Sequence, residues 1–447
     1  MTGTVSSVVD EEERMAAGAR VTAGIVATGS ELLAGRVRDA NGPWIAERLG
    51  RLGIDVTEIV LVGDRPEEMA AALRSLAEVD LVVTSGGLGP TADDLTAAVV
   101  ADLTGRPLEL DEHMEKVVGD IIARFADRLR WDADALADAN RKQAMVPRGA
   151  SAIPPVGTAP GLAVPPGDGF RPTVLVLPGP PREVQGMWDD AVASGPMQAL
   201  LERTEPFAET HLRLFGVPES EIAATLRAVG ERTDITPLEI TTCLRDFTLE
   251  VDLRRAPGDE AAAVAHDAVV AEIDARHGSA VFSRTGETID EILFDLLSGH
   301  TIATAESCTG GLLAGRLTAP AGASAHVQGG IVSYSNEAKA HLLGVPQQVL
   351  DTHGAVSTQA VQAMARGAID RFGVDVAVAI SGIAGPGGGT EAKPVGYVCF
   401  CVRTADGTEI VRDPVLPGDR GDVRERSVVL AMHLVRRILT PRDQAVS

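Results

Sequence analysis

Aromatic residues are scarce in this chain: phenylalanine, tryptophan and tyrosine make up only 3% of its 447 residues. A surface on which nucleic-acid bases stack against aromatic rings is therefore not favoured. Basic residues are also in the minority, because 40 lysines and arginines face 63 aspartates and glutamates, for a formal net charge of −23. Such a chain repels phosphate backbones and anionic membranes, so we expect no nucleic-acid partner and no membrane partner.

Cysteines and long apolar runs are few as well. The chain has four cysteines, and the one close pair, Cys399 and Cys401, gives neither a zinc-ligand spacing nor a disulfide framework. No stretch approaches the roughly 18 apolar residues that a transmembrane helix needs. We therefore expect a cytoplasmic protein. Residues 1–18, which are acidic where a signal peptide would be basic, are expected to form a disordered leader.

Strand and helix patterns alternate through the first 200 residues. Apolar runs at residues 21–27, 54–62 and 80–84 alternate with helical patterns that begin near residues 41 and 66. This alternation predicts a doubly wound, mainly parallel α/β sheet. The segment 150–170 is rich in proline and glycine and is expected to form a loop over the site of this domain.

The loop after the third apolar run is the most informative part of this half. Gly86, Gly87 and Gly89 permit close approach of the backbone to an anion, and Asp93 and Asp94 stand near a helix start. Two carboxylates in that position could ligate a hard divalent cation. They could equally do no more than favour the positive end of the helix dipole.

A change of pattern marks the middle of the chain. Residues 211–217 and 241–253 alternate apolar and polar side chains, and residues 259–276 form an alanine-rich helical pattern. These features predict a small α+β module. We expect it to act as a spacer or as a dimer contact.

The chemistry is expected near residue 307. An apolar run at residues 300–305 leads into Ser307 and Cys308, two possible nucleophiles, and then into Gly310 and Gly311 before a helical pattern. Free amides at a helix start can bind a phosphate or an oxyanion. The alternative is an ordinary turn with a serine cap.

Two further loops follow strand-like runs downstream. Tyr334 and Lys339 come after residues 327–332, with Asn336 suited to capping the helix, and a glycine-rich loop beginning at Ser381 comes after residues 377–380. In α/β sheets, ligands bind where such loops meet at the carboxyl ends of strands. The sequence therefore predicts that a nucleophile, a base and a glycine-rich cradle converge.

Five ordered blocks over about 160 residues resemble the carboxy-terminal domain of the CinA family, which is similar to nicotinamide-mononucleotide deamidases. The blocks are residues 305–311, 334–339, 381–386, 393–396 and 417–420. The resemblance implies a nucleotide amidase that needs no cofactor for deamidation. It assigns Ser307 as nucleophile and Lys339 as base, with Tyr334 as relay or alternative base; a solvated helix lysine is the other interpretation of Lys339.

Amide hydrolysis also needs donors for the oxyanion, and the substrate that the resemblance implies carries a 5′-phosphate. The amides of Thr309, Gly310 and Gly311 become oxyanion donors, each worth about 3 kcal/mol in the transition state. The loop that starts at Ser381 and Gly382 would bind the 5′-phosphate together with Arg420. Alternatively, Arg420 is a surface residue at a helix start, and Thr309 and Ser381 are simple caps.

Blocks at residues 29–35, 86–94 and 177–183 resemble the molybdopterin-binding fold. In CinA proteins this domain is associated with ADP-ribose pyrophosphatase activity, which implies a divalent metal at Asp93 and Asp94. Ser30 stands where molybdenum-cofactor relatives usually carry an acidic residue, which favours the CinA assignment. The α+β module resembles the family's KH-like linker in fold only, because the RNA-clamping Gly-x-x-Gly loop is missing.

We therefore expect a molybdopterin-binding-like α/β domain at residues 19–199, a KH-like α+β linker at 200–284 and an α/β deamidase domain at 285–447. The expected function is pyridine-nucleotide salvage acting on small nucleotide substrates. Two alternatives are a molybdopterin-binding protein with a silent C-terminal domain and a competence-linked interaction protein. Loops placed at strand ends often complete their sites across a symmetric dimer, so a homodimer is expected.

Overall fold

The computed structural model describes residues 20–440 except 90, 92–93 and 127–139. The expected leader, residues 1–18, and Asp93 therefore lie outside the described residues. The chain folds into two compact units, residues up to 208 with 256–258, and residues 209–255 with 259 onward. No helix in the part of the chain that the structure describes is both long and apolar enough to cross a bilayer.

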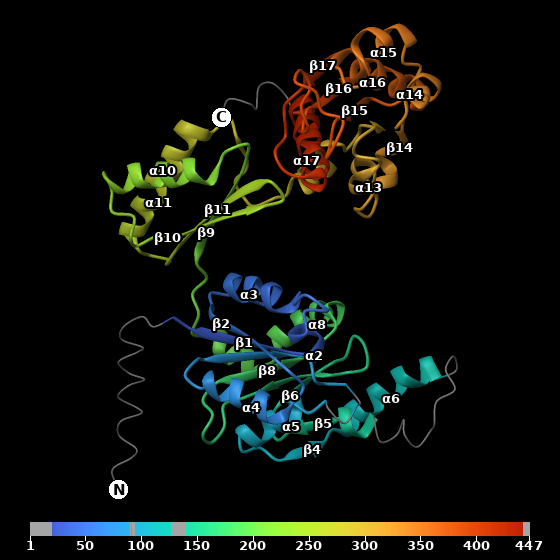
Figure 1. Cartoon of the computed structure of the whole chain (residues 1–447). Helices are drawn as coiled ribbons and strands as arrows, with labels where there is room; N and C mark the ends of the chain where they lie inside the picture. Colours follow the sequence, from blue (N-terminus) through green and yellow to red (C-terminus); the bar gives the residue numbers. More distant parts are fainter. Residues whose placement is uncertain (1–19, 90, 92–93, 127–139, 441–447) are drawn as a thin grey trace. The chain divides into compact units, whose positions relative to one another are not determined.

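The N-terminal unit is built on a six-stranded sheet in the order β2-β1-β3-β8-β7-β6 (Figure 1). Its strands are β1 (Thr22–Thr28), β2 (Asp55–Val62), β3 (Leu81–Ser85), β6 (Ser151–Ile153), β7 (Gly161–Val164) and β8 (Thr173–Leu177). The first four strands of that order are parallel, and β7 and β6 are antiparallel additions. The predicted α/β sheet is confirmed.

Helices cover both faces of this sheet. The helices of this unit are α2 (Ser30–Leu33), α3 (Asn41–Arg51), α4 (Pro66–Ser75), α5 (Thr96–Leu103), α6 (Glu112–Ala126), α8 (Pro181–Ala193) and α9 (Gly195–Leu201), of which α6 packs in a separate cluster with Leu110 of the β4 segment. One apolar core joins the sheet to α3, α8 and α9, and a second joins the other face to α4 and α5. A separate pair, β4 (Leu108–Leu110) and β5 (Met145–Pro147), lies outside the sheet.

The segment 150–170 is not only a loop, so that expectation was wrong. It contributes β6 and β7 to the sheet, and β7 is fully buried against β8. Strands of three and four residues are too short to show a clear alternation. The prolines and glycines around them therefore dominated the sequence pattern.

The α+β module has a four-stranded sheet in the order β10-β11-β9-β12. Its elements are β9 (Ala208–Phe215), α10 (Glu219–Gly230), β10 (Glu239–Arg245), β11 (Thr248–Arg255), α11 (Glu260–His277) and β12 (Val281–Ser283). The run 241–253 is a hairpin rather than one strand, with a two-residue turn between β10 and β11. Residues 209–255 and 259–283 belong to the same compact unit as the C-terminal domain.

The C-terminal domain has a five-stranded sheet in the order β14-β13-β15-β16-β17. The strands are β13 (Ile302–Glu306), β14 (Val327–Val332), β15 (Val376–Gly382), β16 (Val398–Thr404) and β17 (Glu409–Arg412). β14, β13 and β15 are parallel, while β16 and β17 are antiparallel. The carboxyl ends of β13, β14 and β15 therefore meet at one edge.

Two apolar cores hold helices on the two faces of this sheet. One face carries α12 (Ile289–Leu296), α13 (Leu312–Leu317) and α17 (Arg420–Leu439), and the other carries α14 (Asn336–Leu343), α15 (Gln347–His353) and α16 (Thr358–Phe372). A short 3-10 turn, η1 (Ala323–Ala325), precedes β14.

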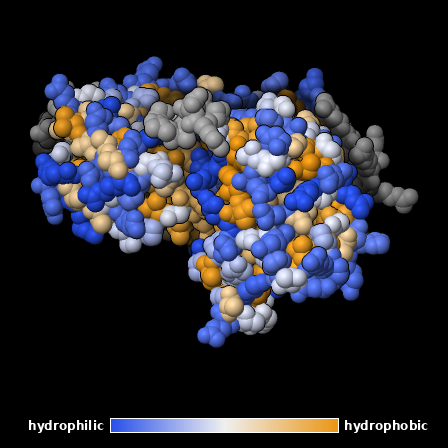
Figure 2. Space-filling model, turned by 90° about the horizontal axis from the view of Figure 1, so that it is seen from above, coloured by the Kyte–Doolittle hydropathy of each residue, from blue (hydrophilic) through white to orange (hydrophobic). Residues whose placement is uncertain are grey.

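Figure 2 shows one face of the whole chain. The described residues on this face are mostly hydrophilic, with smaller apolar areas between polar ones.

Candidate active site

Ser307 and Lys339 meet at the carboxyl edge of the C-terminal sheet. Ser307 follows the last residue of β13, and its amide donates to the carbonyl of Ile380 in β15 at 2.9 Å. Lys339 lies on α14, after β14, and its Nζ donates to Ser307 Oγ at 3.0 Å. The parallel order of β14, β13 and β15 thus brings residues 32 positions apart into direct contact.

Lys339 is buried, with only 1% of its surface exposed. Its Nζ also donates to the carbonyl of Ser333 at 2.8 Å and, less closely, to that of Tyr334 at 3.4 Å. Burial disfavours the charged ammonium and lowers the pKa of Lys339 from 10.5 to about 8. A solvated helix lysine would show none of these features, so the geometry favours the interpretation of Lys339 as a base.

Ser335, not Asn336, caps this helix. The Ser335 side chain accepts a hydrogen bond from the amide of Ala338, and Asn336 is the first helical residue. Serine and asparagine are equally good caps, so the sequence offered no way to place the boundary to within one residue. The shift leaves Lys339 one turn into the helix, where it reaches back toward the strand end.

Glu306 is the site residue that sequence reasoning missed. Its buried carboxylate ends β13 and accepts hydrogen bonds from the amides of Gly311, Leu313 and Ala314 at 2.8 to 3.1 Å, while the Thr304 hydroxyl donates to it as well. The carboxylate therefore caps α13 from the preceding strand, where the negative charge also suits the helix dipole. In the sequence, the only sign of this role is that a charged residue ends an otherwise apolar, buried strand.

This cap corrects the expected oxyanion site. The amides of Gly310 and Gly311 are not free, because Gly310 donates to the carbonyl of Ser307 at 3.1 Å and Gly311 donates to Glu306. Both glycines have positive φ angles, 62° and 96°, so their role is to form the tight turn between Ser307 and α13. The third expected donor, the Thr309 amide, bonds to neither of these groups and lies beside the Cys308 thiol.

Cys308 lies beside Ser307 but in a different environment. Its side chain is packed in the apolar core with α13 and α17. Burial raises the pKa of the Cys308 thiol to about 11, although the amides of Cys308 and Thr309 act in the opposite direction. A buried thiol is a poor nucleophile, because the thiolate is the reactive form.

Arg424 of α17 fixes the backbone of this loop. Its guanidinium donates to the carbonyl of Cys308 at 3.1 Å and to the carbonyl of Thr309 at 3.0 Å. The loop is therefore held from both sides, by Glu306 through α13 and by Arg424 through α17. The hydroxyls of Thr309 and Ser333 are buried and have no hydrogen-bond partner among the described residues.

The structure places Tyr334 and Arg420 at the exposed mouth of the site. Arg420 donates to the Tyr334 hydroxyl at 3.2 Å and to the carbonyl of Gly385 at 2.9 Å, so it joins two loops. The Tyr334 side chain is 61% exposed, and only its carbonyl contacts Lys339. The phenol is therefore not placed as the relay between Lys339 and Ser307 that the resemblance implied.

Ser381 and Gly382 serve the sheet rather than an open cradle. The buried Ser381 hydroxyl donates to the carbonyl of Ala355 at 2.7 Å. A Cβ at Gly382 would lie 2.6 Å from the side chain of Val398, so this position requires glycine for close packing against β16. Neither residue presents a free side-chain donor to a phosphate.

The glycine loop of the N-terminal unit lines a cavity of about 150 Å³. Gly87, Gly89, Asp94 and Lys142 border it, together with mainly apolar side chains. Gly86 follows β3 and lies beside the carboxyl end of β8, where its amide donates to the carbonyl of Leu177 at 3.0 Å. The structure thus brings the predicted Gly86, Gly87, Gly89 and Asp94 together at the carboxyl edge of the sheet.

The described residues do not gather the ligands that a metal ion would need. Asp94 accepts hydrogen bonds from the amide and hydroxyl of Thr91. No group of three His, Cys, Asp or Glu side chains with metal-binding geometry occurs within residues 20–440 as far as they are described. Asp93, the other half of the predicted pair, lies outside the described residues, so the metal site stays a prediction.

The chain is a multidomain α/β protein in which an α+β module connects two α/β domains. The second of these α/β domains contains the buried pair of Ser307 and Lys339. Residues 286–439 match the family described as CinA C-terminal domain, and residues 24–198 match the family described as probable molybdopterin binding domain. The chain is 55% identical over 421 residues to a CinA-like protein of Mycobacterium sp. (strain JLS), covering 93% of this chain and 98% of that protein. The chain belongs to the CinA family.

A second relative matches over almost the whole chain. It is a CinA-like protein of Mycobacterium tuberculosis (strain ATCC 25177 / H37Ra), 50% identical over 433 residues, which cover 95% of this chain and 99% of that protein. The crystal structure of a competence/damage inducible protein from Agrobacterium tumefaciens is 40% identical, with a TM-score of 0.33, and covers 34% of this chain and 96% of its own.

One prediction follows from the Glu306 cap. Glu306→Gln keeps the size of the side chain but replaces one acceptor oxygen by a donor, which then faces backbone amides. We expect the free energy of unfolding to fall by about 2 kcal/mol, measured by urea denaturation. Glu337→Gln, in the exposed first turn of α14, is the matched control and should leave the midpoint unchanged. Equal midpoints for both variants would show that the Glu306 cap contributes nothing.

Proposed function

We propose that the C-terminal domain hydrolyses the carboxamide of nicotinamide mononucleotide to nicotinate mononucleotide and ammonia. The observation that carries this proposal is the buried contact of 3.0 Å between Ser307 Oγ and Lys339 Nζ. Membership of the CinA family supports it, because the blocks that resemble nicotinamide-mononucleotide deamidases include both residues. Small-molecule nucleotides are the substrates in this proposal.

Lys339 acts first as a base. With a pKa of about 8, a substantial fraction of the side chain is neutral near physiological pH. The neutral amine takes the proton of Ser307 Oγ while that oxygen attacks the carboxamide carbon. The amides of Cys308 and Thr309, which follow the nucleophile directly, are the donors we assign to the developing oxyanion.

Lys339 then acts as an acid. Its ammonium returns the proton to the departing nitrogen, so the C–N bond breaks, ammonia leaves and an ester remains on Ser307. Water attacks the ester, Lys339 takes one of its protons and passes it to Ser307 Oγ, and the acid product gives its remaining proton to the solvent and leaves as a carboxylate. Lys339 carries the transferred proton in both half-reactions, so this cycle uses side chains, backbone amides and water alone.

Arg420 is the residue we assign to the 5′-phosphate. Two of its N–H groups hold Gly385 and Tyr334, and its side chain remains exposed at the mouth of the site. An arginine in such a position offers further donors to a phosphate. Because the Ser381 hydroxyl is already bonded, the loop beyond it would contribute backbone amides only.

The cavity beside Gly87 and Gly89 supports a second candidate activity, cleavage of the pyrophosphate of ADP-ribose by the N-terminal unit. The cavity is lined mainly by apolar side chains, as suits the flat face of a base, and Lys142 supplies a positive charge at its edge. The described residues do not by themselves form a divalent-metal site, so we derive no step through a metal.

One experiment tests both activities. The purified full-length protein is incubated with nicotinamide mononucleotide or with ADP-ribose, each with and without a chelator, and the products are identified by mass spectrometry. We expect ammonia and nicotinate mononucleotide at the same rate with and without chelator, because the proposed cycle needs no metal. Chelator-sensitive deamidation would contradict the mechanism, and a lack of deamidation under all conditions would contradict the function.

A further inference from the structure

A two-residue turn in the α+β module contacts the C-terminal domain. Asp246 and Phe247 form the whole turn between β10 and β11, because Arg245 pairs directly with Thr248. Both turn residues have positive φ angles, 48° and 59°, and they are the described non-glycine residues with this conformation. A left-handed conformation costs about 1 kcal/mol or more for a residue such as phenylalanine. Strain of this kind persists where neighbouring contacts compensate for it.

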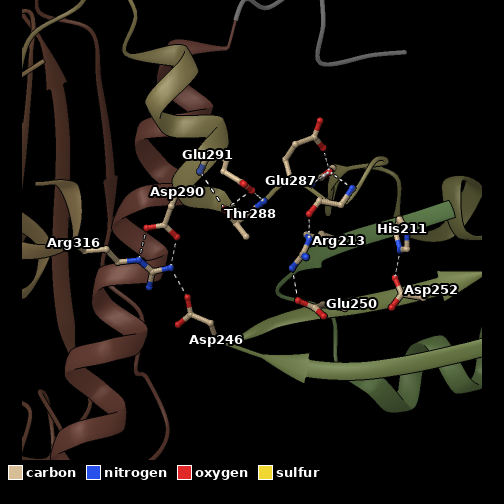
Figure 3. A network of polar contacts seen from close by, with 12 residues as sticks. His211, Arg213, Asp246, Glu250, Asp252, Glu287, Thr288, Asp290, Glu291 and Arg316 are labelled. Atoms are coloured by element: carbon tan, nitrogen blue, oxygen red, sulfur yellow. Dashed lines mark hydrogen bonds and ion pairs between the residues drawn. The ribbon is translucent and has the colours of Figure 1, made fainter. Parts of the chain in front are cut away.

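Asp246 contacts the helix that begins at the nucleophile loop. Its carboxylate bonds to Arg316 of α13, and the same guanidinium bonds to both carboxylate oxygens of Asp290 at 2.6 and 2.8 Å (Figure 3). Helix α13 has only six residues, and Glu306 holds its first amides. Arg316 therefore lies about one helical turn from the start of α13, which directly follows the loop 307–311.

Phe247 contacts the other helix that holds the same loop. Its ring lies under the guanidinium of Arg426 of α17, 4.2 Å from the ring centroid. Two residues earlier on α17, Arg424 donates to the carbonyls of Cys308 and Thr309. The two turn residues thus reach separately the two helices that fix residues 307–311.

The rest of the module forms a firm base for this contact. Arg213 of β9 is paired with Glu250 of β11 and donates to the carbonyl of Gly286 at 2.6 Å, which ties the module to the start of the C-terminal domain (Figure 3). Phe215 of β9 stacks on His433 of α17, with ring centroids 3.9 Å apart. A turn mounted on this base holds its two contacts in a fixed position.

We propose that Asp246 and Phe247 are positioning residues: through Arg316 and Arg426 they fix the two helices that hold the Ser307 loop, so the α+β module orders the active site of the C-terminal domain. The kinetic part of this proposal rests on the amide hydrolysis proposed above. The structural part does not, because order in residues 307–311 can be measured without a substrate.

The test uses the double variant Asp246→Asn, Phe247→Gly in the full chain. Asparagine followed by glycine is the preferred pair for a two-residue turn with positive φ angles, so the hairpin is kept or improved. The ion pair with Arg316 and the ring under Arg426 are both lost. Asp274→Asn, which breaks an ion pair with Arg284 elsewhere in the module, is the matched control.

Alkylation of Cys308 reports on the loop directly. The thiol is 5% exposed, so labelling requires the loop to open, and the buried Cys399 and Cys401 of β16 serve as internal controls. The exposed Cys243 is replaced by serine in all variants. We expect the double variant to label at Cys308 at least about tenfold faster than the Asp274→Asn control, with Cys399 and Cys401 unchanged.

Kinetics supply the second measurement. A loosened loop misplaces Ser307 while leaving the residues at the mouth in place, so kcat for deamidation should fall about tenfold with little change in KM. Unchanged labelling of Cys308, or an equal rise at Cys399 and Cys401, would overturn the proposal whatever the kinetics. If the wild-type protein releases no ammonia, the proposed function fails, and the labelling alone decides the positioning role.

Discussion

Ser307→Ala should abolish most of the deamidation, with kcat lower by a factor of about 10³ or more, a loss of roughly 4 kcal/mol in transition-state stabilisation. The reason is geometric: Ser307 Oγ is the hydroxyl to which Lys339 Nζ is bonded at 3.0 Å. The measurement is steady-state ammonia release from nicotinamide mononucleotide, with thermal melting to confirm that the variant is folded.

Cys308→Ala is the neighbouring control for this substitution. The Cys308 thiol packs into the apolar core and has a pKa of about 11, so it contributes no thiolate near neutral pH. We expect kcat to stay within about tenfold of wild type, or about 1.4 kcal/mol in the barrier. An inactive Cys308→Ala beside an active Ser307→Ala would replace this mechanism by that of a cysteine amidase.

The contact between Ser307 and Lys339 could be predicted from the sequence for a physical reason. Both residues follow apolar strands, and the carboxyl ends of parallel strands meet at one edge of a sheet. Because β13 and β14 are neighbours in that sheet, the two loops had to lie side by side. The same reasoning placed Gly86 and Gly87 at the edge of the N-terminal sheet.

The hydrogen-bond acceptors of the backbone amides near Ser307 could not be predicted in the same way. Glycines before a helix suggest free donors, and the charge of Glu306 at the end of a buried strand is unusual, but the local pattern does not show that its carboxylate accepts from those amides. Glu306 ends a buried strand, so only its position in three dimensions shows that it turns back to cap α13. The expected oxyanion donor at Gly311 was wrong for this reason, and the one at Gly310 was wrong because its amide closes the turn onto the Ser307 carbonyl.

The hairpin turn shows a second limit. Two-residue turns are usually marked by asparagine or glycine, and Asp246 followed by Phe247 carries no such signal. In the sequence, the alternation of apolar and polar side chains in β10 and β11 therefore continues through the turn as a single strand-like segment. Phe247 has a left-handed conformation and its ring contacts Arg426 of α17, and no local pattern contains that contact.

Lys339→Met should remove both the base and the acid of the proposed cycle, and kcat should fall by about 10³. In the wild-type protein the pKa of about 8 predicts a pH dependence as well. The base must be neutral, so kcat/KM should be low at acidic pH, where Lys339 is protonated. It should rise with pH and level off above about pH 8. A rate that does not change between pH 6.5 and 9 would show that Lys339 is not the base.

The same substitution should make the protein more stable at neutral pH. The folded-state pKa of Lys339 lies below its ordinary value of 10.5, so the unfolded chain binds more protons between about pH 8 and 10.5. The contribution of Lys339 to the free energy of unfolding is therefore lowest below pH 8, where the folded protein must hold a buried ammonium, and it rises between about pH 8 and 10.5.

Methionine fills a similar volume without a charge, so Lys339→Met should melt at a higher temperature at pH 7, and the difference should shrink toward pH 10. Lys116→Met, at an exposed lysine of α6, is the control, and it should not raise the melting temperature at pH 7. A Lys339→Met protein that is less stable than wild type at pH 7 would mean that the hydrogen bonds to Ser307 and Ser333 outweigh the cost of burial.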